Sequence, residues 1–414
     1  MIEFSGFTLD NGLRVIHHPD PKSTVVVLNI LYNVGARDEQ EDKTGFAHLF
    51  EHLMFGGSIN IPDYDKHVEQ AGGSNNAFTN NDYTNYYITV PLENVETAFW
   101  LESDRMLQLA FSQNSLDVQK GVVLEEFRQR CFNAPFGKLW HHSRSLLYKS
   151  HPYRWPTIGL ELAHIEQATL GDVEAFYYKH YHPANAILCV AGNISLEETK
   201  RLCEKWFAGI DRKGTVNKNL YPAETEQRER RFLKTKDLSP SPGVFMCWRG
   251  PGYMDLKSAG LELFGDVLGG SETSPLYLEL VKRSGLMNAA ESFCMRSLDD
   301  SIFMVYGLLN EGLGLEEGEA ALGNLLQETL MGKHMEEKLF QAAKNKLRSQ
   351  LLFEKTSLMT IAQKLCYFEL LGDVQMIHTE NETYQKMNYE NTLETARALF
   401  RKENASVIYY EPND

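Results

Sequence analysis

Two kinds of pattern alternate along the chain: β-branched apolar runs, and stretches with apolar residues at helical spacing. Near the N-terminus, two short apolar segments flank an Asp-Asn-Gly turn, which predicts a β-hairpin over residues 7–17. Residues 24–34 and 186–192 predict buried strands, and residues 74–90 predict an extended segment. The helical spacing predicts helices in this half of the chain over residues 44–55, 95–108, 116–130 and 169–178.

The second half of the chain repeats this order less clearly. A predicted strand at 244–248 precedes a predicted helix at 258–267, a glycine pair and a further predicted helix at 276–284. The segment LFGDVLGGS at 263–271 is similar to LFEHLMFGGS at 49–58 if one gap is allowed. Together with the shared order of elements, this similarity indicates a weak internal duplication.

The composition and charge of the chain exclude several classes of function. The net charge of −15 argues against nucleic-acid binding, because the chain has no broad positive surface for phosphates. The N-terminus has no signal-peptide pattern and no run approaches the length of a membrane span, so we expect a cytoplasmic protein without a transmembrane segment. The six cysteines are scattered and form no C-x-x-C pair, so we expect reduced thiols and no zinc ligation by cysteine.

The predicted helix at 44–55 contains the sequence HLFEH, which is a candidate metal site. His48 and His52 are four residues apart, so they share one helical face with their Cβ atoms about 5–6 Å apart. Two imidazoles at this spacing can bind one zinc ion at about 2.0–2.1 Å. Glu51 directly precedes the second histidine and can point toward the same ion.

A catalytic zinc site also needs a carboxylate ligand and an open position for water. Glu125 and Glu126, in the sequence VVLEEF, are the obvious candidates. Adjacent residues of a helix point about 100° apart, so only one of the two can face the metal.

The internal alignment and the chain length predict two domains, of which only one binds metal. His48, Glu51 and His52 stand opposite Glu262, Gly265 and Asp266. A chain of 414 residues is also longer than one hydrophobic core usually serves. We therefore expect a zinc-bearing catalytic domain over 1–212, a polar linker over 213–236, and a second, metal-free homologous domain over 237–414.

The segments HLFEH and VVLEEF together resemble the M16 family of inverted-motif zinc peptidases, the group of pitrilysin, insulin-degrading enzyme and mitochondrial processing peptidase. The stretch GGSNNAFTNNDYTNYYITVP at 72–91 is similar to the family's substrate-binding edge strand, and HPYRWPTIG at 151–159 to its proline-bearing loop. YHPANAILCVAGNI at 181–194 is similar to the family as well. The resemblance covers nearly all of the first half, whereas the second half shares only the order of elements.

The resemblance implies both a fold and a site. The fold is α+β, with two related α/β domains of the inverted-motif zinc peptidase type (LuxS- and processing-peptidase-like), each a largely antiparallel sheet packed with helices. The zinc ligands are then His48, His52 and Glu126, with Glu51 as the general base. The implied substrate-binding residues, which can pair with an extended peptide by β-augmentation, are Asn76, Ala77, Phe78 and Thr79.

The chain departs from the family pattern at three positions. Gln119 stands where the family usually has a glutamate seven residues before the ligand, and it could hydrogen-bond a histidine ligand without supplying charge. In the family's R-x-x-x-G-L-x-Y segment, an arginine and a tyrosine bind the substrate. Val281 and Asn288 occupy these two positions here.

These observations predict a zinc-dependent endopeptidase that cleaves peptides or unfolded segments, and that forms a homo- or heterodimer. The expected partner is an M16-like subunit that carries the arginine–tyrosine pair. The alternatives are a non-enzymatic scaffold, like the family's core subunits of respiratory complexes, and a zinc hydrolase of non-peptide substrates. The intact HLFEH and Glu125-Glu126 favour the enzyme over the scaffold, and the edge strand favours peptides.

Overall fold

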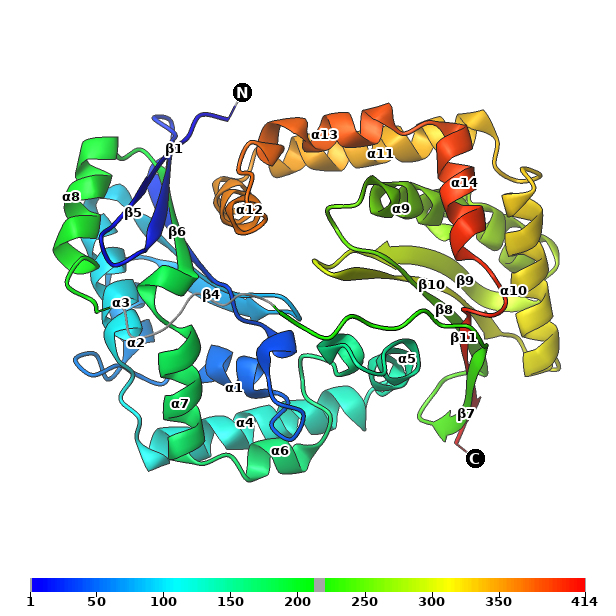
Figure 1. Cartoon of the computed structure of the whole chain (residues 1–414), viewed down its shortest axis with the longest axis horizontal. Coiled ribbons are helices and arrows are strands. Elements are labelled where there is room, and N and C mark those ends of the chain that lie inside the picture. Colours follow the sequence, from blue (N-terminus) through cyan, green and yellow to red (C-terminus); the bar gives the residue numbers. More distant parts are fainter. Residues whose placement is uncertain (1, 212–219, 414) are drawn as a thin grey trace. The chain divides into compact units, whose positions relative to one another are not determined.

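A computed structural model describes residues 2–211 and 220–413 (Figure 1). The chain divides into two compact units, each assembled from three segments. The first unit contains Met1–Phe127, Pro156–Tyr221 and Leu352–Thr379, and the second contains Arg128–Trp155, Pro222–Leu351 and Glu380–Asp414. Within the described residues, no helix is long and apolar enough to cross a membrane.

The first unit is built on a six-stranded sheet with the order β1-β2-β6-β3-β5-β4. Only β2 and β6 pair in parallel, and all other neighbours are antiparallel. The strands are β1 (Ser5–Thr8), β2 (Arg14–Pro19), β3 (Val25–Tyr32), β4 (Ser74–Thr79), β5 (Thr84–Pro91) and β6 (Ala186–Gly192). Strand β4 therefore lies at one edge of this sheet and β1 at the other.

The two faces of this sheet are covered by helices from different parts of the sequence. The helices of this unit are α1 (Phe46–Leu53), α2 (Tyr64–Gln70), α3 (Val95–Leu107), α4 (Gln113–Cys131), α6 (Leu162–Glu166), α7 (Leu170–His180), α8 (Leu196–Trp206) and α12 (Leu358–Leu370). Successive side chains of β3 point to opposite faces of the sheet, and both faces are buried. On one face, Val26, Leu28 and Ile30 belong to the main core of the unit. The other face carries Asn29, whose carbonyl accepts a hydrogen bond from Cys366 of α12.

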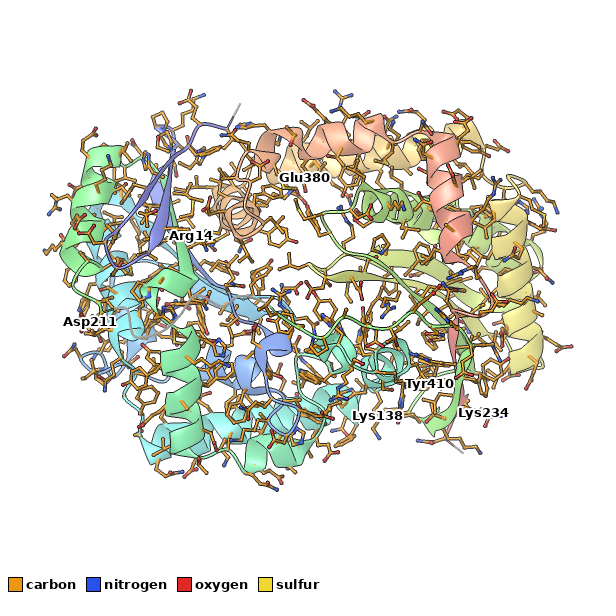
Figure 2. All side chains as sticks on the ribbon, in the orientation of Figure 1. Arg14, Lys138, Asp211, Lys234, Glu380 and Tyr410 are labelled. Carbon is orange, nitrogen blue, oxygen red and sulfur yellow. The ribbon has the colours of Figure 1, made fainter. Side chains whose placement is uncertain are left out.

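Helix α12 is the last helix along the sequence that lies wholly in the first unit. It packs against β3 and β6. Its Glu369 forms an ion pair with Arg14 of β2 at 3.3 Å, and Arg14 is labelled in Figure 2. The first sheet is thus covered on one face by a helix that lies more than 150 residues after the last strand of that sheet in the sequence.

The second unit repeats the arrangement of the first with one strand fewer. Its sheet has the order β7-β11-β8-β10-β9, with β7 and β11 parallel and the other pairs antiparallel. The strands are β7 (Arg231–Asp237), β8 (Gly243–Pro251), β9 (Met287–Met295), β10 (Asp300–Leu309) and β11 (Ser406–Pro412). Without β1, the first sheet has the same order and the same position of its parallel pair, which supports the internal duplication.

Helices pack against both faces of the sheet in the second unit. They are α5 (Leu139–Leu147), α9 (Leu256–Gly269), α10 (Leu315–Leu330), α14 (Tyr389–Leu399) and the π-helix η5 (Leu276–Arg283). The unit also contains most of α11 (Glu337–Glu354) and of α13 (Met376–Lys386). Val244 and Met246 of β8 belong to the core that includes residues of α9, α10 and α14. Phe245 and Cys247 face the opposite way, into a smaller cluster with Leu147 of α5.

Most elements predicted from the pattern are found within a few residues of the expected positions. The hairpin, the strands at 24–34, 186–192 and 244–248, and the helices at 44–55, 95–108, 116–130, 169–178 and 258–267 correspond to β1–β2, β3, β6, β8, α1, α3, α4, α7 and α9. The extended segment at 74–90 is two strands, β4 and β5, joined by a turn. The helix predicted at 276–284 has π geometry instead of α geometry.

The linker prediction needs one correction. Residues 231–236 were predicted to be part of it, but they form most of β7, which pairs with β11. Their alternation of half-buried and exposed side chains is that of an edge strand, and the many charged residues there had suggested a loop. Residues 212–219 of the predicted linker lie outside the described residues.

Candidate metal centre

Helix α1 begins at a tightly fixed N-terminus. The buried carboxylate of Glu39 accepts hydrogen bonds from the backbone N–H groups of Gly45 at 2.9 Å and Ala47 at 2.8 Å. A negative charge here also complements the positive end of the helix dipole. Gly45 has a φ of +87°, and a Cβ there would come within 3.3 Å of Gly159, so the position requires glycine.

The apolar side of α1 is buried in the core of the first unit. Phe46, Leu49, Phe50 and Leu53 are all less than 7% exposed. The opposite side carries His48, Glu51 and His52, which share a face because they occupy positions i, i+3 and i+4. The hydrophobic pattern of the helix therefore determines which way the polar side chains point.

His48 and His52 converge on Glu126 of α4. The Nε2 atom of His48 is 3.4 Å from Oε2 of Glu126, and the Nε2 atom of His52 is 3.3 Å from the same oxygen. One ligand atom from each residue lies within 4.8 Å of the other two. The two imidazole rings are nearly perpendicular, with centroids 4.9 Å apart.

This geometry fits a tetrahedral zinc ion. Zinc bonds of about 2.0–2.2 Å at tetrahedral angles separate neighbouring ligand atoms by about 3.3–3.5 Å. The two distances to Glu126 fall in this range. Two imidazoles and one carboxylate leave a fourth position open, which is the donor set of catalytic zinc sites.

The site is partly open to solvent. The side chain of His48 is 9% exposed, whereas those of His52 and Glu126 are 24% and 21% exposed. Of the two candidate carboxylates, the structure brings Glu126 next to the histidines, while Glu125 is an exposed neighbour outside the cluster. Glu51 is half-buried.

Gln119 lies on α4, seven residues before Glu126 and half-buried. Among residues 2–211 and 220–413, none forms a hydrogen bond with its side-chain amide. The suggested contact between Gln119 and a histidine ligand therefore remains a prediction.

The residues predicted to bind substrate lie on the edge strand β4. Asn76, Ala77, Phe78 and Thr79 pair with β5 on one side, and no strand of the described residues pairs with them on the other. The backbone N–H of Ala77 donates to the side chain of Asn76 at 2.8 Å. This contact indicates that the N–H points to the free side of the strand.

Two residues outside α1 form hydrogen bonds to this helix and were not identified from the sequence. Glu39 precedes the helix by several residues and follows no capping pattern that the sequence makes visible. Tyr86 of β5 donates a hydrogen bond to the carbonyl of Phe50 in α1 at 3.3 Å, and nothing in its strand pattern distinguishes it from other core aromatics. Both contacts depend on tertiary structure.

In the second unit, the two positions that the internal duplication aligns with the histidine ligands hold acidic residues, and each of them forms an ion pair within the chain. Glu262, opposite His48, accepts a hydrogen bond from Arg296 at 3.1 Å, and Asp266, opposite His52, pairs with Lys346 at 2.9 Å. Within the described part of this unit, no three His, Cys, Asp or Glu side chains gather as a metal cluster. Val281 is half-buried on η5, and Asn288 is exposed on β9.

Comparisons with known proteins bear on this arrangement. Residues 14–133 match the family described as "Insulinase (Peptidase family M16)", and residues 167–347 match "Peptidase M16 inactive domain". The chain belongs to peptidase family M16. The family predicted from HLFEH and VVLEEF is thereby confirmed, and the two matched segments together span most of the chain.

Individual M16 relatives are similar over the whole length. "Zinc protease PqqE" of Helicobacter pylori is 27% identical over 413 residues, which is 98% of this chain and 92% of that protein. A crystal structure of a protease from Helicobacter pylori has a TM-score of 0.91 with 25% identity, and each chain is covered completely. A structure of a peptidase M16 inactive domain from Pseudomonas fluorescens has a TM-score of 0.89 with 16% identity, over 100% of this chain and 98% of that chain. The predicted fold class, two related domains with mixed sheets and helices, is confirmed.

Proposed function

We propose that this M16 chain is a zinc-dependent endopeptidase, in which His48, His52 and Glu126 bind the metal and Glu51 is the general base. The observation that carries the proposal is the convergence of both imidazoles on one carboxylate oxygen at 3.3 and 3.4 Å. The name of the Helicobacter pylori relative, a zinc protease, supports the choice of metal.

The chain's own residues define the chemistry. Zinc at this donor set would act as a Lewis acid and lower the pKa of a coordinated water to about 7. Glu51 shares a helical face with both histidines, so its carboxylate is positioned to take a proton from the attacking water. The same carboxyl group can then donate that proton to the leaving amine nitrogen as the peptide bond breaks.

The edge strand β4 supports a peptide as the substrate. Its free side offers backbone groups to an extended segment, which would add to the sheet as a further strand. Because such pairing uses main-chain hydrogen bonds, we expect Asn76, Ala77, Phe78 and Thr79 to recognise an extended conformation more than a particular sequence. This favours peptides and unfolded segments over folded proteins.

We further propose that full activity requires a partner subunit of the M16 type. Val281 cannot donate a hydrogen bond, and Asn288 is too short to reach where a tyrosine hydroxyl would be, so this chain lacks both substrate-binding groups expected there. Arg283, a nearby cation, already pairs with Glu279 at 2.6 Å. A homodimer would lack the same groups twice, which favours a heterodimer with a chain that carries them.

A scaffold role is the second candidate, because Val281 and Asn288 replace the family's substrate-binding pair. It is separated from the first by measuring zinc and hydrolysis together. We expect the purified chain to hold about one zinc per molecule, and Glu51→Gln to keep this metal while hydrolysis of a mixed peptide library falls by several orders of magnitude. A preparation with neither zinc nor hydrolysis, alone or with an M16 partner, would favour the scaffold.

A further inference from the structure

A buried tyrosine ties helix α1 at the residue directly before Glu51. Tyr86 of β5 is 0% exposed and stands opposite Ala77 of the edge strand β4. Its hydroxyl donates to the backbone carbonyl of Phe50 at 3.3 Å. The same carbonyl accepts the N–H of Met54 at 3.0 Å, which is an ordinary bond of the helix. One carbonyl of α1 therefore connects the helix to the sheet beneath it.

The ring of Tyr86 is held in place by a buried charged pair. The guanidinium carbon of Arg105 lies 4.4 Å from the ring centroid. Glu102 in turn binds this guanidinium through Nε at 2.9 Å and Nη2 at 2.6 Å, and Glu102 and Arg105 are each no more than 1% exposed. Tyr32 meets the ring edge-on at 5.9 Å. With all sides occupied, the hydroxyl has little freedom to leave the carbonyl.

The surroundings also keep the hydroxyl a donor. Burial first, then Tyr181 and the charge of Glu51, raise the pKa of Tyr86 well above its ordinary value. The phenol therefore stays protonated across the pH range in which the protein would work.

We propose that Tyr86, braced by Arg105, is a positioning residue that fixes the rotation of α1 about its own axis and so aims Glu51, His48 and His52. Side-chain tips lie about 5–6 Å from a helix axis, so a rotation of about 10° moves them by about 1 Å. A displacement of that size can cost up to about 100-fold in rate when it misaligns reacting groups. The catalytic part of this inference rests on the proposed hydrolysis. The hydrogen bond from Tyr86 to the carbonyl of Phe50, which we call the tether, does not depend on it.

The test compares Tyr86→Phe with Tyr32→Phe. The first variant removes only the hydroxyl bound to Phe50 and leaves the ring beneath Arg105. The second removes a hydroxyl that is equally buried and has no hydrogen-bond partner among residues 2–211 and 220–413. Each variant loses one oxygen atom from the same region of the core, so general effects on packing are matched.

Two readouts are needed, and one of them does not require activity. Amide hydrogen exchange of α1, above all at Met54, should become about two- to tenfold faster in Tyr86→Phe, the factor expected for one net hydrogen bond. With a hydrolysed peptide, kcat should fall by about 10- to 100-fold while KM stays within twofold, because β4 is unchanged. Tyr32→Phe should behave like the unmodified chain in both measurements.

The possible outcomes separate this inference from the proposed function. If the exchange of α1 is equal in the two variants, the tether is wrong. If exchange rises in Tyr86→Phe but kcat and zinc affinity, measured against a chelator, do not change, the positioning role is wrong although the contact exists. If the unmodified chain with its partner neither binds zinc nor hydrolyses peptides, the proposed function fails, and the exchange comparison still decides on the tether.

Discussion

Replacing Glu102 with glutamine tests the buried charge pair in the core of the first unit. Glu102 and Arg105 are three residues apart on α3 and are 0% and 1% exposed. In addition to Arg105, the hydroxyl of Tyr64 donates to Glu102 at 2.7 Å. Glutamine preserves the shape of the side chain but removes its charge, which leaves the guanidinium of Arg105 uncompensated.

The expected cost follows from the burial of both partners. Removing one member of a buried ion pair typically costs about 3–5 kcal/mol, because the remaining charge stays without water or counter-charge. For a unit of this size, each kcal/mol lost from the free energy of unfolding lowers the midpoint of thermal unfolding by about 2–4 °C. We therefore expect the midpoint for Glu102→Gln to fall by roughly 6–20 °C.

A matched control is available on α8. Glu198 and Arg201 have the same residue types and the same spacing, and Arg201 binds Glu198 through Nε and Nη2, both at 2.7 Å. Their side chains are 42% and 55% exposed, so water can replace each partner. Glu198→Gln should leave the free energy of unfolding, measured by urea denaturation, almost unchanged.

A second comparison separates charge from packing. Nη1 of Arg105 has no hydrogen-bond partner within the described residues, so even the intact pair is incompletely satisfied. The double variant Glu102→Leu, Arg105→Met removes both charges and should be less destabilised than Glu102→Gln alone. If Glu102→Gln and Glu198→Gln had similar effects, or if the double variant were the least stable, the argument from burial would be refuted.

Two of the three further predictions concern the site, and the third concerns the pH dependence of stability. Glu126→Gln should weaken zinc binding while Glu125→Gln should not, as titration against a chelator would measure, and the opposite order would reverse our assignment of the ligand. Ala77→Pro removes the N–H on the free side of β4 and should raise KM about two- to tenfold with kcat and zinc content retained; an unchanged KM would count against peptide pairing there. Burial raises the pKa of Asp300 to about 6, although the positive charge of Arg249 lowers it in part. The folded state thus holds this proton more tightly than the unfolded state, and stability should fall as pH rises from about 4 to 6, by up to about 3 kcal/mol. Asp300→Asn should abolish that part of the pH profile of urea unfolding, and a profile identical to that of the unmodified chain would contradict it.

The metal centre was predictable from the sequence because its residues follow local rules. The spacing of His48 and His52 within an apolar helical pattern determines that they share a face. The choice between Glu125 and Glu126 could not be made from helical geometry alone, since either could have faced the histidines. It depended on the family resemblance, and the structure brings Glu126 to them.

Helix α3 shows why the surroundings of the site could not be predicted. The segment 95–108 was expected to be amphipathic, which would place charged residues in solvent. Instead, Glu102, Asp104 and Arg105 are all buried. Glu102 and Arg105 pair with each other at a spacing that the sequence shows. Their further contacts, with Tyr64 of α2 and Tyr86 of β5, come from other elements, so no periodicity within α3 could reveal that this pair is buried.

The late position of α12 in the sequence has a consequence for synthesis. A nascent chain can form β1 to β6 once Gly192 has left the ribosome, but α12 ends only at Leu370. At about 5–20 residues per second, the intervening stretch takes on the order of 10–30 s to translate. Throughout that interval the sheet face that carries Val27 and Leu31, each no more than 2% exposed in the finished protein, lacks α12, the helix that packs against β3 and β6. We therefore expect the growing polypeptide to expose this apolar sheet face for many seconds, and chaperones that recognise apolar surfaces to bind it during that interval.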